Sequence, residues 1–369
     1  MRALSQEATG RSRRTRSKVY FMIDLRSDTV TQPTPDMLKA MMAAAVGDDV
    51  LGDESATTEL ERRCAQLTGK EACLFVPSGT MGNQICIATH TQPGDAVLME
   101  RGAHVLFHEC GGPAVISNVI TCPVDSADGV MAISDLHRCV MIRSEHTPGT
   151  RLLCVENSNN RAGGTVINAG QMAEFRAFAD EYGLKIHLDG ARIFNAATAL
   201  GVPVIELTKH VDSVMFCLSK GLGAPVGSVI CGSADFIRAA RQWRKRLGGG
   251  LRQSGILAAA GLYGLEHIAP KLADDHRRAK EVGSGLVGIS GISVYPEKTV
   301  TNILLIHTQR PASEWVAALA KSGVQCLAAD RNRVRLVFHH QVGDDAVPAI
   351  IDGFRQASAS LADGGSVVG

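Results

Sequence analysis

Short apolar runs alternate with helical patterns along most of the chain. The apolar run 152–155 and the run 184–188 each predict a strand. Between them, apolar side chains recur at helical spacing: Met172, Phe175, Phe178 and Tyr182. Gly183 follows, where a glycine commonly ends a helix. Because a strand, a helix and a strand joined by short links make a right-handed crossover, the two strands are predicted to be parallel.

The same alternation extends to both sides of this unit. The segment 72–76 predicts a strand that leads into a helix, and the almost wholly apolar run 211–218 predicts a strand covered on both faces. Thr34 and Pro35 form a favourable helix start, and the apolar spacing within 60–67 predicts a second helix. These patterns together indicate an α/β fold built around a mainly parallel sheet.

The pattern changes after the triple glycine at residues 248–250. An Ala-rich helical pattern covers 256–268, and a charged one covers 272–286. Strand-like runs follow at 302–307 and 333–338. A chain of 369 residues is long enough for two domains of about 150 residues each. We therefore expect a smaller α+β domain after the main sheet.

The composition argues against several classes of protein. The chain has 38 basic and 37 acidic side chains, so its net charge of +1 offers no electrostatic footprint for nucleic acid or an anionic membrane. Hydrophobic residues make up 45% of the chain, which argues against wholesale disorder, and no apolar run approaches the roughly 18 residues of a membrane span. The ten cysteines include no C-x-x-C pair, so we expect reduced thiols and a cytoplasmic protein.

The first 21 residues differ from the rest of the chain. They hold six basic side chains and one acidic side chain, and they lack apolar periodicity. We expect a disordered basic tail, or a start upstream of a natural initiator at Met22. An organelle leader rich in Arg and Ser is the alternative.

Polar residues stand at the ends of predicted strands, where ligands bind in open α/β sheets. Asp189 closes one strand and Lys220 follows another. Partial desolvation would lower the pKa of the Lys220 amine and make it a nucleophile, although a lysine at such a place is more often solvated. Ser78, Gly79 and Thr80 form a turn at a predicted helix start. This turn offers N–H groups and a hydroxyl to a phosphate, or it serves only as a helix cap.

Other motifs of enzyme chemistry find no support in the sequence. It has no Walker A pattern, no H-E-x-x-H metal motif and no G-x-S-x-G nucleophile elbow, and no metal site is predicted. Gly221, Gly223 and Gly227 miss the dinucleotide-binding pattern by one residue. They indicate instead a close approach of the backbone after Lys220.

One cofactor unites a phosphate turn, an acid at one strand end and a lysine at another. Pyridoxal phosphate needs its phosphate held, its ring nitrogen kept protonated and its aldehyde linked to a lysine. Asp189 would hold the proton on the ring nitrogen, and Lys220 would form the Schiff base. The order of these features along the chain is that of the aminotransferase-like fold.

Four segments carry a resemblance to a known family. They are 22–31, 75–83, 187–195 and 216–228, with the sequences MIDLRSDTVT, FVPSGTMGN, HLDGARIFN and FCLSKGLGAPVGS. In these segments the chain resembles the low-specificity L-threonine aldolases, pyridoxal-phosphate enzymes of the aminotransferase-like class, fold type I. The resemblance covers about nine-tenths of the chain.

This resemblance implies a large domain with a mainly parallel, seven-stranded sheet and a smaller α+β domain. We expect a disordered tail over 1–21 and an N-terminal segment joining the small domain over 22–33. The large cofactor-binding domain is expected over 34–258, the small domain over 259–362 and a flexible tail over 363–369.

The resemblance also implies roles for single residues. Lys220 would form the Schiff base, Asp189 would pair with the pyridine nitrogen, and His104 would stack on the pyridine ring. Further cofactor contacts are implied for Ser78, Gly79, Thr80, Arg192, Ser219 and Arg252. Substrate contacts are implied for Ser27, Asn159, Arg192 and Arg335. Two guanidinium groups on one carboxylate would fix the Cα bond that is to be broken.

One segment departs from the family pattern. Where the family has Glu-Asn-Thr-His-Asn, residues 156–160 of this chain are ENSNN. Asn159 therefore stands in place of a titratable group near the substrate. Proton transfer from the β-hydroxyl would then rely on His104, His146 or a water, or the chain cleaves a different β-hydroxy amino acid.

The resemblance implies cleavage of L-threonine, L-allo-threonine and related L-β-hydroxy-α-amino acids to glycine and an aldehyde. A β-eliminating lyase or an aminotransferase of the same fold is the alternative. A homodimer or homotetramer with shared active sites is expected, and Arg252 resembles the arginine that reaches a neighbouring site. Without this resemblance, Arg335 is interpreted as an ordinary strand arginine in a surface ion pair.

Overall fold

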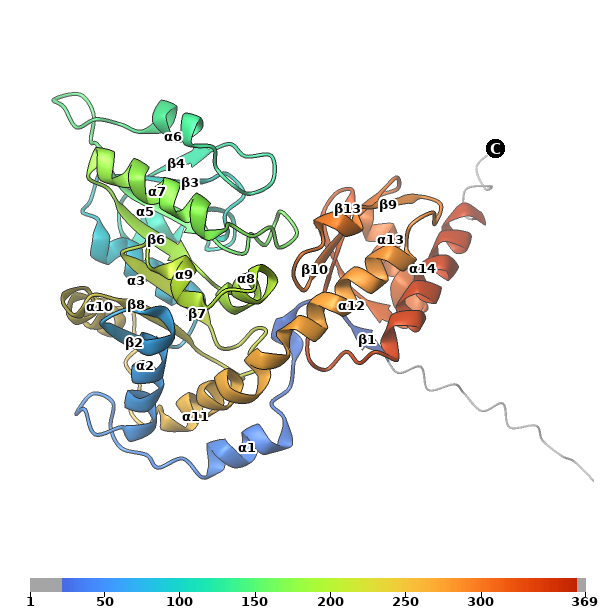
Figure 1. Cartoon of the computed structure of the whole chain (residues 1–369), viewed down its shortest axis with the longest axis horizontal. Coiled ribbons are helices and arrows are strands. Elements are labelled where there is room, and N and C mark those ends of the chain that lie inside the picture. Colours follow the sequence, from blue (N-terminus) through green and yellow to red (C-terminus); the bar gives the residue numbers. More distant parts are fainter. Residues whose placement is uncertain (1–21, 364–369) are drawn as a thin grey trace, which may run out of the picture.

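A seven-stranded sheet forms the centre of the larger part of the computed structural model, which describes residues 22–363 (Figure 1). Its strand order is β2-β8-β7-β6-β5-β3-β4. The strands are β2 (Ala72–Val76), β3 (Ala96–Glu100), β4 (Ile120–Val124), β5 (Thr150–Glu156), β6 (Lys185–Asp189), β7 (Ser213–Cys217) and β8 (Ser228–Gly232). Only β8 is antiparallel to its neighbours, β2 and β7, and all other pairs are parallel. The predicted mainly parallel sheet is confirmed.

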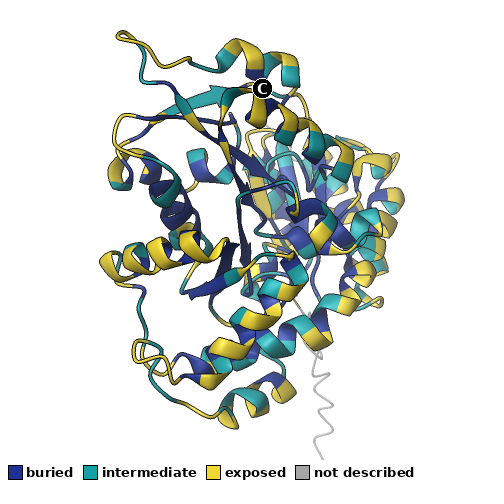
Figure 2. Ribbon diagram, turned by 60° about the vertical axis from the view of Figure 1, so that its left-hand side comes forward, coloured by how far each residue is buried: buried dark blue, intermediate teal, exposed yellow. Residues whose placement is uncertain are grey.

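Helices cover both faces of this sheet, because successive side chains of each strand point to opposite faces. On β7, Val214 and Phe216 join one core, whereas Met215 and Cys217 join the other. The first face is covered by α2 (Ser55–Thr68), α6 (Ile133–Cys139), α7 (Ala169–Tyr182), α8 (Ile193–Leu200) and α9 (Val204–Thr208). The second is covered by α3 (Gly79–His90), α4 (His104–Phe107) and α10 (Ala234–Arg246), with α5 (Gly112–Ile116) against α3. Figure 2 shows the strands as mainly buried between these layers.

The predicted helix ends are present and have the expected physical causes. The Thr34 hydroxyl accepts a hydrogen bond from the Met37 N–H, which caps α1 (Pro35–Met42). Gly183 ends α7 in the left-handed conformation with φ of 65°. The strand–helix–strand unit that the sequence predicts is therefore β5, α7 and β6.

A second, four-stranded antiparallel sheet follows, with the order β12-β13-β10-β9. Its strands are β9 (Ile292–Val294), β10 (Ile303–Thr308), β12 (Leu327–Asp330) and β13 (Arg333–Val337), and its helices are α12 (Leu272–Gly285), α13 (Ala312–Lys321) and α14 (Ala346–Asp363). Trp315, Phe338 and Phe354 lie in its separate core. Leu25 joins the same core, because β1 (Ile23–Asp24) pairs with β11 (Val324–Gln325).

The chain passes between the two cores through α11 (Gly255–Tyr263) and a π-helical turn, Gly264–Ile268. Ala258 and Ile268 still belong to the core of the seven-stranded sheet. The predicted boundary between the two domains at residue 258 stays a prediction. Because Ala258 and Ile268 pack in the core of the larger sheet, the structure favours a boundary after Ile268. Single 3₁₀ turns complete the elements: Asp28–Val30, Ala269–Lys271 and Pro296–Lys298.

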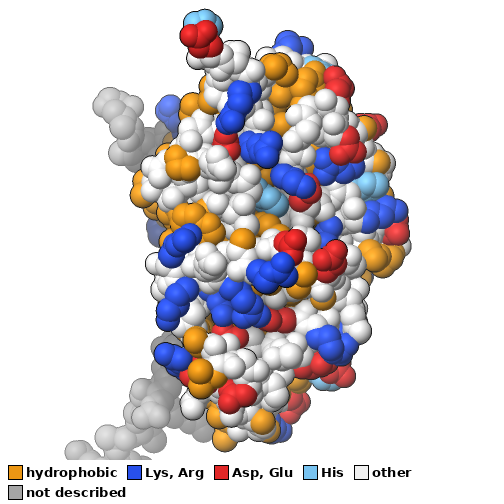
Figure 3. All heavy atoms as spheres, turned by 90° about the vertical axis from the view of Figure 1, so that its left-hand side faces the viewer, with side chains coloured by type: hydrophobic (Ala, Val, Ile, Leu, Met, Phe, Trp, Pro, Cys, Tyr) orange, Lys and Arg blue, Asp and Glu red, His pale blue; other side chains and the backbone are white. Residues whose placement is uncertain are grey.

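Predictions for residues 1–21 and for the tail from residue 364 lie outside the described range, whereas residue 363 ends α14. No helix within residues 22–363 is both long and apolar enough to cross a lipid bilayer. On the face shown in Figure 3, basic side chains lie beside acidic ones. This mixture agrees with the net charge of +1.

Candidate active site

Polar side chains meet at the carboxyl edge of the parallel strands. Glu156 ends β5 and Asp189 ends β6, and the two are paired in the register of the sheet. Both side chains are buried. Lys220 follows β7, and its charge is close enough to act on His104 and on Asp28. The sheet therefore brings the predicted acid and the predicted lysine to one edge.

Asp189 is held by hydrogen bonds to both of its carboxylate oxygens. Its Oδ2 accepts from the Nδ2 of Asn83 at 2.9 Å, and its Oδ1 accepts from the Ala191 N–H at 3.1 Å. Asn83 lies on α3, which packs across the second face of the sheet. These two hydrogen bonds fix the orientation of the Asp189 carboxylate at the end of β6.

His104 stands at the start of α4 and is held by a buried glutamate. Its Nδ1 lies 3.0 Å from Oε1 of Glu109, a side chain with no exposed surface. Burial opposes protonation of His104, but the hydrogen bond to Glu109 and the charge of Asp189 outweigh it. The pKa of His104 is consequently raised above its usual value.

Glu156 holds the backbone on which His104 stands. Its two oxygens accept from the N–H groups of His104 and Asn160, each at 2.8 Å. Burial and the charge of Asp189 raise the pKa of Glu156 to about 7. The acid at the end of β5 therefore links the α4 turn to the segment after that strand.

The start of α3 offers N–H donors to an anion. The Ser78 hydroxyl caps this helix by accepting from the Met81 N–H at 3.2 Å. The N–H groups of the first turn, including those of Gly79 and Thr80, have no partner within a helix. A Cβ at Gly79 would lie 2.8 Å from the Cys217 sulfur, so only glycine fits there without displacement. Such a turn with a 12-residue helix behind it offers the donors that a phosphate needs, and its assignment to the cofactor phosphate stays a prediction.

A buried and a half-buried arginine approach each other from different parts of the fold. Arg192 begins α8 next to Asp189, whereas Arg335 comes from β13 of the second sheet. Arg335 donates from Nη1 to Oδ1 of Asn160 at 2.8 Å, while its buried Nε has no hydrogen-bond partner among residues 22–363. Burial and the nearby charge of Arg192 lower the pKa of Arg335. Two guanidinium groups near each other suit a carboxylate, and the assignment of this pair to the substrate stays a prediction.

Ser27 and Ser219 are each adjacent in the chain to a residue of the site, Asp28 and Lys220. The Ser27 hydroxyl caps the following 3₁₀ turn by accepting from the Thr29 N–H at 3.2 Å, next to Asp28. Ser219 is half-buried between β7 and Lys220. The assignment of both residues to the site stays a prediction.

Two residues that the sequence predicts for the site, His146 and Asn159, form no hydrogen bond with Asp189 or Lys220 within the described part of the chain. His146 is exposed in the loop before β5, so it stands at the opposite end of this strand from Glu156. The chain does not bring it to Asp189 or Lys220. Asn159 is buried, and its Oδ1 accepts from the Ala162 N–H at 2.9 Å. This amide holds the loop after β5, and its contact with the substrate stays a prediction.

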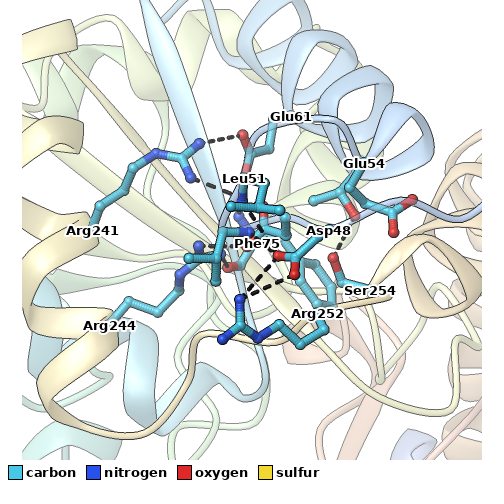
Figure 4. Close-up of polar contacts among 12 residues, drawn as sticks. Asp48, Leu51, Glu54, Glu61, Phe75, Arg241, Arg244, Arg252 and Ser254 are labelled. Carbon is cyan, nitrogen blue, oxygen red and sulfur yellow. Dashed lines mark hydrogen bonds and ion pairs between the residues drawn. The ribbon is translucent and has the colours of Figure 1, made fainter.

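Arg252 pairs with an acidic residue in the loop before α2. It is exposed and donates from Nη1 to Oδ2 of Asp48 at 3.0 Å (Figure 4). In the same view Arg241 reaches Glu61. The cofactor contact implied for Arg252 through a neighbouring subunit stays a prediction.

Sequence reasoning did not assign several residues of this site: Asp28, Asn83, Glu109, Glu156 and His187. Four of them carried a signal, since Asp28, Asn83 and His187 lie within the family-like segments and Glu156 ends a predicted strand. Glu109 carried none. It reaches the site only because the turn after α4 folds against α3.

Pyridoxal phosphate fits these groups. The first turn of α3 is suited to its phosphate and Asp189 to its ring nitrogen. His104 could cover the ring face, and Lys220 could bind the aldehyde. The assignment of Arg335 to the carboxylate of an amino acid stays a prediction.

Comparisons with known proteins identify the family. The model of the family described as beta-eliminating lyase matches residues 24–309. Low-specificity L-threonine aldolase 1 of Arabidopsis thaliana is 41% identical over 351 residues, which cover 93% of this chain and 98% of the relative. The chain belongs to the L-threonine aldolase family. The Low specificity L-threonine aldolase of Escherichia coli is 45% identical over 259 residues, with 70% of this chain and 77% of the relative covered.

Solved structures share the fold of this threonine aldolase family member. The threonine aldolase of Leishmania major has a TM-score of 0.77 at 20% identity, over 91% of this chain and 99% of that one. An aspartate aminotransferase of Rhodobacter sphaeroides has a TM-score of 0.68 at 18% identity, over 93% and 92%. The aminotransferase-like fold type I is thereby confirmed. The predicted lyase class and the cofactor pyridoxal phosphate are confirmed as well.

Proposed function

We propose that this chain is a pyridoxal-phosphate-dependent aldolase that cleaves L-threonine, L-allo-threonine and related L-β-hydroxy-α-amino acids to glycine and an aldehyde. One observation supports this most strongly. The buried Arg192 lies three residues after Asp189, and the half-buried Arg335 is close enough for its charge to act on Arg192, so an amino-acid carboxylate and the cofactor have adjacent places. Relatives that carry the name low-specificity L-threonine aldolase cover almost the whole chain.

Each residue then has a distinct task. Arg192 and Arg335 bind the substrate carboxylate and orient its Cα–Cβ bond. Lys220 holds the cofactor aldehyde, and Asp189 keeps a proton on the ring nitrogen. Pyridoxal phosphate, when bound, supplies the electron sink for a carbanion at Cα. The start of α3 holds its phosphate.

His104 is our assignment for the base that takes the β-hydroxyl proton. Glu109 hydrogen-bonds its Nδ1, which leaves Nε2 to face the substrate directly or through a water. His146, the other histidine considered from the sequence, stands at the far end of β5 within its own chain. Asn159 cannot act as a base, because an amide does not titrate.

A β-eliminating lyase is the second candidate, because the matching family model bears that description. It would use the same cofactor but break the bond between Cβ and the hydroxyl oxygen. Its products would be a 2-oxo acid and ammonia. An aminotransferase of the same fold would also yield a 2-oxo acid.

We further propose a cytoplasmic homodimer or homotetramer that acts on a small amino acid. The exposed position of Arg252 supports a contact with a second copy. Sedimentation velocity of the purified protein tests the assembly, and a monomer at working concentration would contradict it.

Cofactor attachment gives the first test of the proposed function. The purified protein is expected to be yellow, and borohydride should fix the cofactor to Lys220, as peptide mass analysis would show. The variant Lys220→Ala should be colourless after the same treatment. A colourless wild type after reconstitution with pyridoxal phosphate would overturn the proposal.

A further inference from the structure

The amide of Asn83 lies between the two carboxylates behind the candidate active site. Its Nδ2 donates one hydrogen bond to Oδ2 of Asp189 at 2.9 Å and another to Oε1 of Glu109 at 2.8 Å. Single ligand atoms of His104, Glu109 and Asp189 all lie within 4.8 Å of one another. Two carboxylates this close repel each other unless donors stand between them. Asn83 supplies these donors.

The orientation of this amide is set by His187. Oδ1 of Asn83 lies 3.0 Å from Nε2 of His187. Because both N–H groups of Asn83 are used, its Oδ1 must accept, and His187 must carry its proton on Nε2. The Nδ1 of His187 then accepts from the Ser213 hydroxyl at 3.0 Å, and this hydroxyl accepts from Nε2 of His90 at 2.8 Å.

Local structure explains why these four side chains meet. His187 and Asp189 are two residues apart on β6 and therefore point to the same face. Ser213 lies opposite His187 in the pairing of β6 with β7. Asn83 and His90 are seven residues apart, which is two turns of α3, so both lie toward that face of the sheet.

Burial supports this assignment of protons. It lowers the pKa of His187 to about 4 and that of His90 to about 3. Both rings are therefore neutral at neutral pH, with one donor and one acceptor each. A series of hydrogen bonds therefore runs from His90 through Ser213 and His187 to Asn83, each of the first three groups donating to the next. It ends on the carboxylates of Asp189 and Glu109.

We propose that Asn83, oriented by His187, is a positioning residue of the aldolase site. One amide holds Asp189 at the ring nitrogen of the cofactor and, through Glu109, holds His104 at the ring face. This inference rests on the proposed function. With the Asn83 amide turned over, a carbonyl oxygen would face both carboxylates, and the support of the ring would be lost.

Two substitutions of His187 separate this role from simple packing. In His187→Gln, an amide N–H can take the place of the Nε2 donor, whereas His187→Met has a similar reach and no donor. We expect His187→Met to weaken pyridoxal phosphate binding about tenfold or more and to lower kcat with little change in KM, since the carboxylate site is untouched. His187→Gln should stay within about threefold of wild type. Equal losses in the two variants would overturn the inference.

A double-mutant cycle completes the test, with thermal unfolding recorded for each protein. If His187 acts through Asn83, the dissociation constant for pyridoxal phosphate in Asn83→Ala should not rise further when His187→Met is added. Multiplying losses would overturn the inference. Should His187→Met fail to fold, Asn83→Ala alone tests the proposal: it should weaken pyridoxal phosphate binding about tenfold or more, and a dissociation constant within about threefold of wild type would overturn the inference. A wild type that binds the cofactor but does not cleave threonine would refute the proposed function. The dissociation constants for pyridoxal phosphate would still test the role of Asn83.

Discussion

Asp28 holds Arg192 through two hydrogen bonds, 2.7 Å from Nε to Oδ2 and 2.6 Å from Nη2 to Oδ1, and both side chains are buried. Asp28 comes from the N-terminal segment that packs with the second sheet, since Leu25 lies in that core. The pair therefore joins this segment to the end of β6. It also fixes the guanidinium plane and does not use Nη1, the atom that we propose for the substrate carboxylate.

The variant Asp28→Asn should raise KM for the amino acid more than it lowers kcat, because the Arg192 fork loses its orientation. Removing one partner of a buried pair also costs about 3–5 kcal/mol of unfolding free energy. Steady-state kinetics and urea unfolding measure both effects. Asp24→Asn is the matched control, because Asp24 pairs with Arg26 on the same segment and is partly solvent-exposed. Its loss should stay within about 1 kcal/mol. Equal effects of the two changes would contradict this account.

A second prediction concerns the arginine from β13. Arg335→Leu should raise KM for L-threonine by about 10–100-fold, which corresponds to a lost charge-assisted hydrogen bond. Arg333→Leu is the control, since Arg333 lies on the same strand and pairs with Asp330. Its KM should change by no more than about twofold. A similar rise in both variants would remove Arg335 from the substrate site.

A third prediction compares two histidines. His104→Phe keeps an aromatic ring over the cofactor but removes the titratable group, so kcat should fall about 10²–10⁴-fold while the cofactor stays bound. His146→Phe should leave kcat nearly unchanged, because this side chain is exposed at the other end of β5. Initial rates at saturating threonine decide between them. The assignment fails if His146→Phe shows the larger loss.

Glu156 predicts a pH dependence of stability. Its pKa is about 7 in the folded protein against an ordinary value of 4.5. Between these values the folded state binds more protons than the unfolded state, so the free energy of unfolding falls as pH rises through this window. Glu156→Gln does not titrate and should lose this part of the slope, although Asp275, with a pKa raised by burial to about 7, keeps its own share.

Urea unfolding of the cofactor-free protein at about pH 5 and about pH 8 tests this prediction. Wild type should lose more stability between the two than Glu156→Gln does. Identical differences in the two proteins would show that Glu156 is ionised throughout this range.

Much of the site could be predicted from the sequence, because parallel strands end at one edge. Asp189 and Lys220 follow apolar runs, and their meeting is a consequence of the sheet. Arg335 was found only through resemblance, since it arrives from another sheet and no local pattern distinguishes it. His146 lies near β5 in the sequence but before the strand, and a residue before a strand is at the wrong edge.

Other parts depended on tertiary packing. Glu109 shows no signal, because its role arises when the turn after α4 folds against α3. The helical pattern 256–268 was predicted, yet the core to which it belongs was not. The side chains of Ala258 and Ile268 would suit either core, so only their contacts in the structure assign them to the core of the larger sheet.

Product analysis tests the central claim most directly. The reconstituted protein is incubated with L-threonine, L-allo-threonine and L-phenylserine, and the products are identified and quantified. An aldolase is expected to release glycine together with acetaldehyde from the first two and benzaldehyde from the third, in equal amounts. A 2-oxo acid as the sole product would contradict the account and would favour a β-eliminating lyase or an aminotransferase on the same fold.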